Sequence, residues 1–497
     1  MNQITDFKAA AAALRLETRA FIDGRFVDAA SGRTFPTVNP ATGRVITEVA
    51  ACDAEDVDRA VAAARRAFES GAWSRMAPRG RKEVLLKLAD LIEANSEELA
   101  LLETLDCGKP ISDARAVDLP DSVATLRWHA EATDKIYDQM SPAPHDVVSM
   151  IVREPIGVVG AVIPWNFPIF VAMWKLAPAL AGGNSLILKP AELTSLSLLR
   201  IASLAAEAGL PDGVLNVLPG LGHEAGKAIG LHMDIDCVSF TGSGEVGRYF
   251  LEYSARSNLK KIVLECGGKS PAIVMDDVKD LGPVVENLSA GILFCQGENC
   301  SAGSRLLVQE GIRERLLDEL SKQFAEWTVG DPFDPATRVG AMVEERHLDK
   351  VLGLIARGRE EGAKVTFGGN RVLEETGGYF VQPTIFEGVT NAMTIAREEI
   401  FGPVLSVIPF RTGEEAVRIA NDTNYGLASQ LYTDDLNTAH RVAKAIRAGT
   451  VSVNCFSEGD LAVPFGGYKE SGFGGRDKGL AAHDQYTEQK AIWIQLR

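Results

Sequence analysis

The chain has 497 residues, a formal net charge of −16 at pH 7 and an apolar fraction of 46%. One hydrophobic core cannot organise a chain of this length, so two or three domains are expected. The negative charge disfavours nucleic acid and anionic membrane surfaces as partners, because both are themselves negatively charged. It also gives a mild long-range attraction for a cationic substrate.

The seven cysteines are scattered along the chain and form no CxxC pair or Cys/His cluster. The sequence therefore indicates neither a disulfide framework nor a metal site. The first residues lack the apolar stretch and cleavage site of a signal peptide, and no apolar run reaches membrane-spanning length. We expect a cytoplasmic protein whose thiols stay reduced.

The N-terminal third predicts short strands followed by helices. Residues 1–20 favour a short amphipathic helix or a frayed tail, and residues 21–50 favour a meander of short strands between Asp-Gly, Ser-Gly and Pro turns. Apolar residues at three- and four-residue spacing then predict helices over 53–70 and 80–106, with a third over 121–136.

Beyond these helices the pattern changes twice. Residues 142–156 are typical of an exposed hairpin. From residue 156 to Cys266, buried strands alternate with helices, which predicts a parallel sheet covered on both faces, with ligands at the carboxyl ends of its strands. A second α/β region is expected after Ser304, and the stretch from about Tyr486 predicts a terminal strand.

The stretch from Glu265 to Gly303 carries the clearest chemistry. Cys300 lies between Asn299 and Ser301, and a cysteine thiolate is a strong nucleophile. Glu265 can accept a proton from the thiol or from water. Each residue also has a simpler interpretation, Cys300 as a small buried hydrophobe and Glu265 as a surface carboxylate.

Three further motifs suggest a nucleotide site and an oxyanion site. Gly242–Gly247 matches GxGxxG between a strand and a helix, so a pyrophosphate can sit at Ser243, with Glu265 or Lys189 and Glu192 as candidates for a ribose. Lys189 and Glu192 also fit an ordinary helix start. Asn166, between two prolines, can donate to an oxyanion or simply form a turn.

Nearly the whole chain resembles the aldehyde dehydrogenase superfamily. The matching motifs stand in family order: PWNFP, KPAE, FTGSGEVG, LECGGKSP, GENCSAGSR, EEIFGPV, NDTNYGL, GTVSVNC and PFGGYKESG. The resemblance implies that Cys300 attacks the aldehyde, with the Asn166 amide and the Cys300 backbone N–H as oxyanion hole. Hydride then leaves for the nicotinamide, and Glu265 activates water to hydrolyse the thioester. Cys266 and Cys295 are interpreted as packing residues.

The resemblance also implies the binding sites. The family's NAD contacts match the following residues: Trp165, Lys189, Glu192, Gly222, Ser243, Glu399 and Phe401. Glu192 favours NAD over NADP, which stays possible as a secondary cofactor, because a carboxylate repels a 2′-phosphate. The aldehyde tunnel is expected to be lined by the following aromatic residues: Phe167, Trp174, Phe294 and Phe465.

The implied architecture is an α/β fold with a Rossmann-like parallel-sheet cofactor domain, an α/β catalytic domain and a small β oligomerisation arm. The predicted boundaries are 1–141 with 157–266 for NAD binding, 267–470 for catalysis and 142–156 with 485–497 for the arm. A homotetramer or homodimer is expected.

Within the superfamily, the C-terminal stretch looks most like γ-glutamyl-γ-aminobutyraldehyde and guanidinobutyraldehyde dehydrogenases. Glu458, Asp460 and Asp121 are expected near the tunnel mouth, where carboxylates suit an amino or guanidino group, although they also fit solvated loop charges. The alternatives are a broad-specificity aldehyde dehydrogenase and a non-redox thiol esterase. Only His347 lies within fifty residues of Cys300, which argues against a local Cys/His pair.

Two positions depart from the family pattern. Asn299 stands where a small or apolar residue is common, and Gly475 is an extra glycine. Because Gly475 shifts the register, Asp477 matches the family's second acidic residue only approximately, and it is not included among the predicted site residues.

Overall fold

The structure is a computed structural model and describes residues 6–497. The predicted helix or tail over residues 1–20 therefore lies partly outside the described residues. Within them, the helix α1 covers Phe7–Ala12, with the Asp6 side chain capping its first turn.

The N-terminal segment forms short strands and then helices, as predicted, but the strands do not form a single meander. The strands β1 (Ala20–Ile22) and β2 (Arg25–Val27) join a large sheet, whereas β3 (Thr34–Asn39) and β4 (Arg44–Ala50) form a separate pair. The helices that follow are α2 (Ala54–Ser70), α3 (Pro78–Ala94), α4 (Ser96–Cys107), α5 (Ile111–Asp113), the π-helix η1 (Ala114–Asp118) and α6 (Leu119–Ala132).

The single helix predicted over 80–106 is wrong, because the chain breaks it at Asn95. The Asn95 amide donates to the carbonyl of Leu91 at 2.7 Å, and its backbone leaves the helical region with ψ of 17°. An asparagine that bonds back to its own helix commonly ends it, and α4 starts at the next residue. The helix expected over 121–136 ends earlier, at Ala132.

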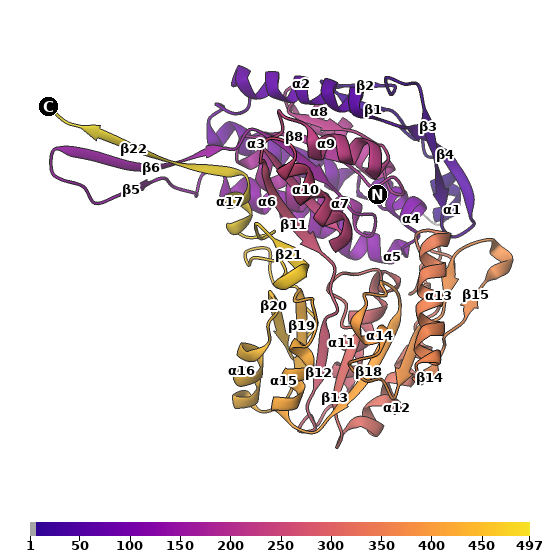
Figure 1. The fold of residues 1–497 in the computed structure, drawn as a ribbon. Coiled ribbons are helices and arrows are strands. Elements are labelled where there is room, and N and C mark those ends of the chain that lie inside the picture. The colour runs from indigo at the N-terminus through magenta and orange to yellow at the C-terminus, as the bar shows by residue number, and fades with distance from the viewer. Residues whose placement is uncertain (1–5) are drawn as a thin grey trace.

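The first large sheet has the strand order β2-β1-β9-β8-β7-β10-β11-β21 (Figure 1). Its five central strands are parallel, and the strands that flank them, β1 and β21, pair antiparallel with their neighbours. Beyond β1 and β2, its strands are β7 (Val158–Val162), β8 (Ser185–Lys189), β9 (Leu215–Val217), β10 (Cys237–Gly242), β11 (Lys261–Cys266) and β21 (Gly472–Phe473). The connecting helices are α7 (Pro168–Ala181), α8 (Leu196–Ala208), the π-helix η2 (Gly222–Gly226), α9 (Lys227–Leu231) and α10 (Gly244–Ala255).

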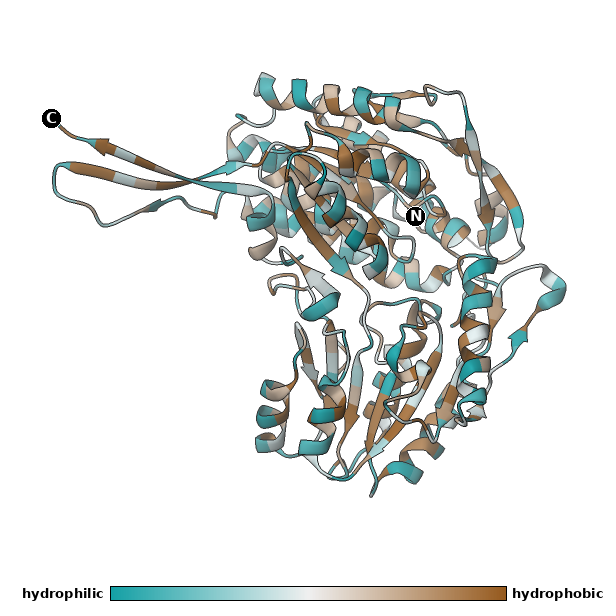
Figure 2. Ribbon diagram, viewed as in Figure 1, coloured by the Kyte–Doolittle hydropathy of each residue, from teal (hydrophilic) through white to brown (hydrophobic). Residues whose placement is uncertain are grey.

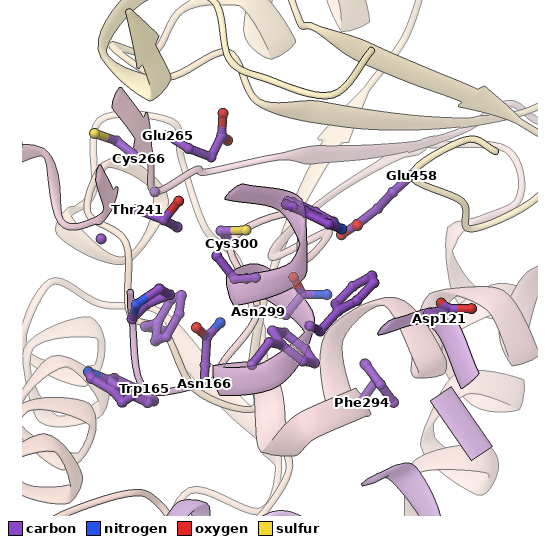
Figure 3. A pocket seen from close by; sticks show the side chains of 18 of the residues that line it. Asp121, Trp165, Asn166, Thr241, Glu265, Cys266, Phe294, Asn299, Cys300 and Glu458 are labelled. Atoms are coloured by element: carbon purple, nitrogen blue, oxygen red, sulfur yellow. The ribbon is translucent and has the colours of Figure 1, made fainter. Parts of the chain in front are cut away.

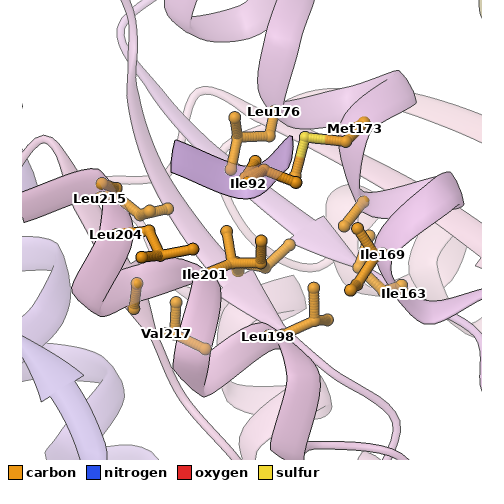
Figure 4. Close-up of a cluster of buried hydrophobic side chains, with 14 of the residues drawn as sticks. Ile92, Ile163, Ile169, Met173, Leu176, Leu198, Ile201, Leu204, Leu215 and Val217 are labelled. Atoms are coloured by element: carbon orange, nitrogen blue, oxygen red, sulfur yellow. The ribbon is translucent and has the colours of Figure 1, made fainter. Parts of the chain in front are cut away.

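Helices cover both faces of this sheet, as the sequence predicts. On one face α3, α7 and α8 pack their apolar side chains against the strands, among them Ile92, Met173 and Ile201 (Figure 4). On the other face α2, α9 and α10 contribute a second cluster with Val61, Ile229 and other side chains. Burial on both faces explains why the strands read as continuous apolar runs.

A second sheet lies in the chain after Cys266, in the order β14-β17-β18-β13-β12-β19-β20, and it is parallel except for the antiparallel edge strand β14. Its strands are β12 (Pro271–Val274), β13 (Arg305–Gln309), β14 (Lys364–Phe367), β17 (Thr384–Glu387), β18 (Val404–Phe410), β19 (Ala428–Tyr432) and β20 (Thr450–Val453). Its helices are α11 (Gly282–Leu293), α12 (Arg313–Ala325), α13 (Glu345–Glu360), α14 (Thr394–Arg397), α15 (Gly413–Asn421) and α16 (Leu436–Ala445). The remaining short elements here are η3 (Phe294–Gly297), β15 (Arg371–Val372), η4 (Glu374–Thr376), β16 (Phe380–Val381) and η5 (Lys469–Ser471).

A three-stranded arm projects from the body (Figure 1). It consists of β5 (Gln139–Met140), β6 (Val147–Pro155) and β22 (Thr487–Gln495), which follows α17 (Ala481–Gln485). The strands β6 and β22 pair antiparallel along their whole length. Hydrophobic residues recur along this exposed arm (Figure 2).

The two parallel sheets with their covering helices confirm the predicted α/β class. In the described part of the chain, no helix is both long and apolar enough to span a bilayer. The domain boundaries remain a prediction.

Candidate active site

The carboxyl ends of three neighbouring strands gather the first predicted residues. The strand β10 pairs with β7 on one side and with β11 on the other. Asn166 follows β7, Ser243 follows β10, and Glu265 lies near the end of β11. Because the strands are parallel, these residues meet at one edge of the sheet.

Cys300 reaches the same place from the second half of the chain. A cavity of about 610 Å³ is lined by Cys300, Glu265, Asn166 and Ser243 together. In the close-up, Cys300 lies between Glu265 on one side and Asn166 on the other, with Glu458 and Asp121 further along the cavity (Figure 3). The structure thus brings together the three predicted catalytic residues.

A strained turn presents Cys300 to the cavity. Cys295, Gln296 and Gly297 adopt positive φ angles of 49°, 45° and 75° in succession. A Cβ on Gly297 would lie 2.3 Å from the carbonyl carbon of Gly402, so only glycine fits there. Cys295 is fully buried, consistent with packing, whereas Cys300 stays partly accessible.

The thiol of Cys300 is in an unfavourable place to ionise by itself. Burial, followed by the negative charges of Glu458 and Glu265, raises the pKa of Cys300 well above its ordinary value. Attack on a carbonyl therefore needs a base or a positive charge close to the sulfur.

Asn166 is held in position for donation. Its amide Nδ2 donates to the backbone oxygen of Glu298 at 2.7 Å, which leaves its second N–H free. The Glu298 carboxyl is fully buried and accepts from the backbone N–H of Val343 at 3.0 Å. Burial raises the pKa of the Glu298 carboxyl to about 8.

Glu265 is a buried carboxyl with an unused acceptor. It is 3% exposed, and its Oε1 has no hydrogen-bond partner among the described residues. Burial first, and then the charge of Asp477, raise the pKa of Glu265 well above its ordinary value, while Lys175 opposes the shift. Asp477 and Lys175 form a buried ion pair at 3.2 Å.

Asp477 is thus a residue that the sequence analysis set aside. The extra Gly475 made the alignment of Asp477 with the family motif ambiguous. Its ion pair with Lys175, visible only in three dimensions, shows where its side chain lies. Lys175 lies in α7, a buried and otherwise apolar helix. Nothing in the sequence of this helix indicates that the lysine side chain pairs with Asp477.

Residues predicted for NAD occupy two regions. Trp165, Ser243, Glu399 and Phe401 line the cavity. Ser243 caps α10 by accepting from the backbone N–H of Val246 at 3.3 Å, and a helix N-terminus of this kind favours an anionic group. The rings of Trp165 and Phe401 meet edge to face at 5.2 Å.

Glu399 faces this part of the cavity from the second half of the chain. It accepts from the backbone N–H of Gly268 at 2.8 Å, and burial raises the pKa of Glu399 to about 7. His347 and Lys350, which the sequence analysis missed, also line the cavity; both lie on α13. The sequence could have indicated that both side chains lie on one face of a helix, because they are three residues apart.

The other predicted NAD residues lie outside the cavity lining. Lys189 is buried at the end of β8, where its ammonium donates to the carbonyl of Pro190 at 2.8 Å and lies 3.5 Å from a Glu192 oxygen. Gly222 is the first residue of η2, and a Cβ added there would have no heavy atom within 4 Å apart from those of its chain neighbours and its own helix. A lysine donor and a carboxylate acceptor at a strand end suit vicinal hydroxyls, so these residues fit a nucleotide that extends beyond the cavity.

Aromatic side chains form one wall of the cavity. Phe167, Trp174 and Phe294 line it as predicted, together with Phe170, which the sequence analysis did not single out. Phe465 differs from its predicted position. It is fully buried and packs behind Trp174 at a centroid distance of 5.1 Å, because it pairs through its backbone with Asp477.

Further carboxylates line the cavity, beginning next to the Cys300 segment. Asp121, Glu458 and Asp460 all line it. The Glu458 carboxylate accepts from the Ser301 hydroxyl at 2.5 Å, and burial raises the pKa of Glu458. An ammonium from Lys478, another residue that sequence reasoning missed, lies at the same place.

Comparison with known proteins decides the family. The sequence matches the aldehyde dehydrogenase family over residues 26–492. The chain belongs to the aldehyde dehydrogenase family. It is 55% identical to the aminoacetaldehyde dehydrogenase of Pseudomonas aeruginosa over 98% of both chains.

Two solved structures superpose closely on this aldehyde dehydrogenase. One is the γ-glutamyl-γ-aminobutyraldehyde dehydrogenase of Burkholderia cenocepacia, with a TM-score of 0.97, 52% identity and 99% coverage of both chains. The other is the indole-3-acetaldehyde dehydrogenase AldA of P. syringae in complex with NAD+ and IAA, with a TM-score of 0.97, 53% identity and 99% coverage of both chains. These similarities confirm the predicted family, fold, aldehyde dehydrogenase activity and NAD cofactor, whereas the roles of individual residues remain predictions.

Proposed function

We propose that this aldehyde dehydrogenase oxidises an aldehyde with an amino, guanidino or γ-glutamylamino group at its far end to the carboxylic acid. One observation carries the proposal: a single cavity contains Cys300, Asn166 and Glu265 together with three further carboxylates, those of Glu458 next to the Cys300 segment and of Asp121 and Asp460. A nucleophile with its oxyanion donor handles the carbonyl, and carboxylates attract a cationic end. The relatives named for amino-substituted aldehydes support this substrate class.

The proposed chemistry starts at the sulfur of Cys300. The thiolate attacks the carbonyl carbon, and the free N–H of Asn166 with the backbone N–H of Cys300 stabilises the negative charge that develops on oxygen. NAD, when bound, would supply the hydride acceptor and a positive charge. Loss of hydride from the carbon leaves a thioester on Cys300.

Glu265 then serves the hydrolysis of that thioester. Its free Oε1 can accept a proton from a water as the water attacks the acyl carbon; the C–S bond then breaks, and Cys300 leaves as a thiolate. Burial holds the carboxyl pKa high, which makes Glu265 a better proton acceptor once it is ionised.

The cofactor contacts follow from the same surfaces. Ser243 at the start of α10 would hold the pyrophosphate, Lys189 with Glu192 the adenine ribose, and Glu399 the nicotinamide ribose. Glu192 keeps its carboxylate partly exposed beside Lys189, where a 2′-phosphate would be repelled, so NAD is expected to be preferred over NADP.

A second candidate is a broad-specificity enzyme for aliphatic and aromatic aldehydes. The wall of Phe167, Phe170 and Trp174 favours it, because three aromatic rings pack edge to face along the cavity. The similarity to AldA, which is named for indole-3-acetaldehyde, points the same way.

The experiment that separates these candidates is a panel of aldehydes assayed with NAD and with NADP. Amino and guanidino aldehydes are compared with neutral aldehydes of equal length, which serve as matched controls. We expect the cationic members to have the higher kcat/KM and NAD to be the better cofactor. Equal kcat/KM across the panel would contradict the amino-aldehyde assignment.

We also propose a cytoplasmic homo-oligomer, a dimer or tetramer, that assembles through the arm. Met140, Trp493 and Leu496 are exposed apolar side chains of the arm and its end. The strand β22 is an edge strand, and exposed edges favour pairing with another chain. The free thiols, including Cys300, suit a reducing compartment.

A further inference from the structure

Lys478 places an ammonium group inside the cavity among several of its carboxylates. The residue is 4% exposed and lines the cavity. Its backbone adopts a positive φ of 63°, an uncommon conformation for a residue with a side chain. The residue therefore has an unusual backbone as well as a buried charge.

The Lys478 ammonium is only partly satisfied by the protein. It donates to the backbone oxygens of Glu458 at 3.2 Å and Gly459 at 3.0 Å. An ammonium has three N–H groups, so one remains for another acceptor. Within the described part of the chain, no carboxylate forms an ion pair with it at 4.0 Å or less.

The surroundings of Lys478 combine both signs of charge with aromatic rings. The ammonium lies 5.8 Å from the ring of Trp174 and 5.9 Å from that of Phe465. The carboxylates of Glu458, Asp121 and Asp460 are near enough to act on its charge. Three negative groups and one positive group thus surround the same space.

We propose that Lys478 determines specificity for aldehydes whose far end carries both a carboxylate and an ammonium group, as an α-amino acid does. The free N–H of Lys478 binds the substrate carboxylate, and Asp121 with Asp460 attracts the substrate ammonium. This proposal rests on the proposed function and names the substrate class of the same cavity.

Simpler substrates satisfy this part of the cavity less well. A lone ammonium must share the carboxylates with Lys478, which repels it. A lone carboxylate meets Lys478 but also three carboxylates of like charge. Only an end with both charges pairs every group, and a hydrogen bond to a charged group contributes about 1.5–3 kcal/mol, or roughly tenfold or more in affinity.

The chain contains a matched control for a purely structural lysine. Lys469 also has a positive φ, of 53°, and donates to two backbone oxygens, of Asn421 and Thr423, both at 2.8 Å. It does not line the cavity. Lys469→Met therefore removes the same kind of loop contact without touching the proposed receptor.

The experiment measures kcat/KM with NAD for three aldehydes of equal length, whose far ends carry both charged groups, the ammonium only or the carboxylate only. In the unmodified enzyme we expect the aldehyde with both groups to be preferred. In Lys478→Met we expect its advantage over the ammonium-only aldehyde to fall about tenfold or more, through KM. Lys478→Arg and Lys469→Met should retain the advantage.

Two results would overturn the proposal. One is an equal loss for both aldehydes in Lys478→Met, which would mean that Lys478 only holds the loop of Glu458. The other is an unmodified enzyme that does not prefer the aldehyde with both groups, a result that needs no variant and so survives misfolding of Lys478→Met. Failure of the proposed function looks different, since in the panel described above a neutral aldehyde of equal length would then equal or exceed the ammonium-only one.

Discussion

At the scale of single residues, the charge balance around Glu265 determines when it can act as a base. The carboxyl accepts a proton only when ionised, and its pKa lies well above the ordinary value because of burial and Asp477. Activity limited by hydrolysis should therefore rise with pH through that pKa. The free energy of unfolding should fall with rising pH between the ordinary carboxyl pKa and this raised pKa, because in that interval the carboxyl is ionised in the unfolded chain but still protonated in the folded one.

Asp477→Asn and Lys175→Met are expected to move this pH dependence in opposite directions. Removing the negative charge of Asp477 lowers the pKa of Glu265, so the rise in kcat should shift to lower pH. Removing the positive charge of Lys175 raises that pKa and should shift the rise to higher pH. The measurement is kcat as a function of pH under saturating aldehyde and NAD. Shifts in the same direction would contradict this electrostatic account, because loss of either partner breaks the same ion pair.

At the scale of elements, the strained turn before Cys300 fixes the position of the nucleophile. Three successive positive φ angles leave no freedom for a side chain at Gly297. The turn packs against the backbone around Gly402, so a change there displaces Cys300 rather than the neighbouring segment.

Gly297→Ala is expected to lower kcat by about 10²-fold, because a displacement of about 1 Å at a reacting group can have this effect. The strained backbone should also cost about 1–3 kcal/mol of stability. Gly353 in α13 is the matched control, since no atom lies within 4 Å of the Cβ position there. Gly353→Ala should raise the free energy of unfolding by about 0.5–1 kcal/mol and keep kcat. Steady-state kinetics and thermal unfolding measure both effects, and a fully active Gly297→Ala enzyme would contradict the account.

The elements also show how much the sequence could predict. Strands β7 to β11 were predictable because each is an apolar run between turn residues. Asn166 follows β7 and Glu265 lies in β11, and both stand in recognisable motifs, as does Cys300 further along the chain. The break at Asn95 was not, because its side-chain bond to Leu91 competes with a pattern that is helical on both sides.

The site residues that sequence reasoning missed depend on contacts between distant segments. Asp477 acquires its meaning from Lys175, about three hundred positions earlier, and Lys478 from the carbonyls of Glu458 and Gly459. The family resemblance placed Phe465 in the aldehyde tunnel, yet the side chain is fully buried against Trp174 and outside the cavity lining. No local pattern reports which of two packed aromatic rings faces the cavity.

At the scale of the whole molecule, the three-stranded arm projects from the body and leaves its edge strands exposed. The strand β22 pairs only with β6 in its sheet, and its outer edge is free within the described residues. Exposed Trp493 and Ile494 lie on this strand. Apolar side chains on an open edge strand favour burial against a second copy of the chain.

Deletion of residues 487–497 is expected to reduce the particle to monomers on a sizing column, because it removes β22 and these apolar side chains. Leu436→Glu, which changes an exposed apolar residue at the start of α16, is the control and should not alter the elution volume. An unchanged elution volume for the deletion would refute the role of the arm.

The two halves of the molecule meet at the reacting atoms, since the first sheet provides Asn166 and Glu265 and the second half provides Cys300. The central claim is that Cys300 carries the acyl group and Glu265 releases it. The most direct measurement is the intact mass of Glu265→Gln enzyme, quenched with acid during turnover with aldehyde and NAD. The account predicts a burst of about one NADH per subunit and an acyl adduct on the peptide that contains Cys300. A burst without an adduct, or an adduct confined to another cysteine, would contradict it.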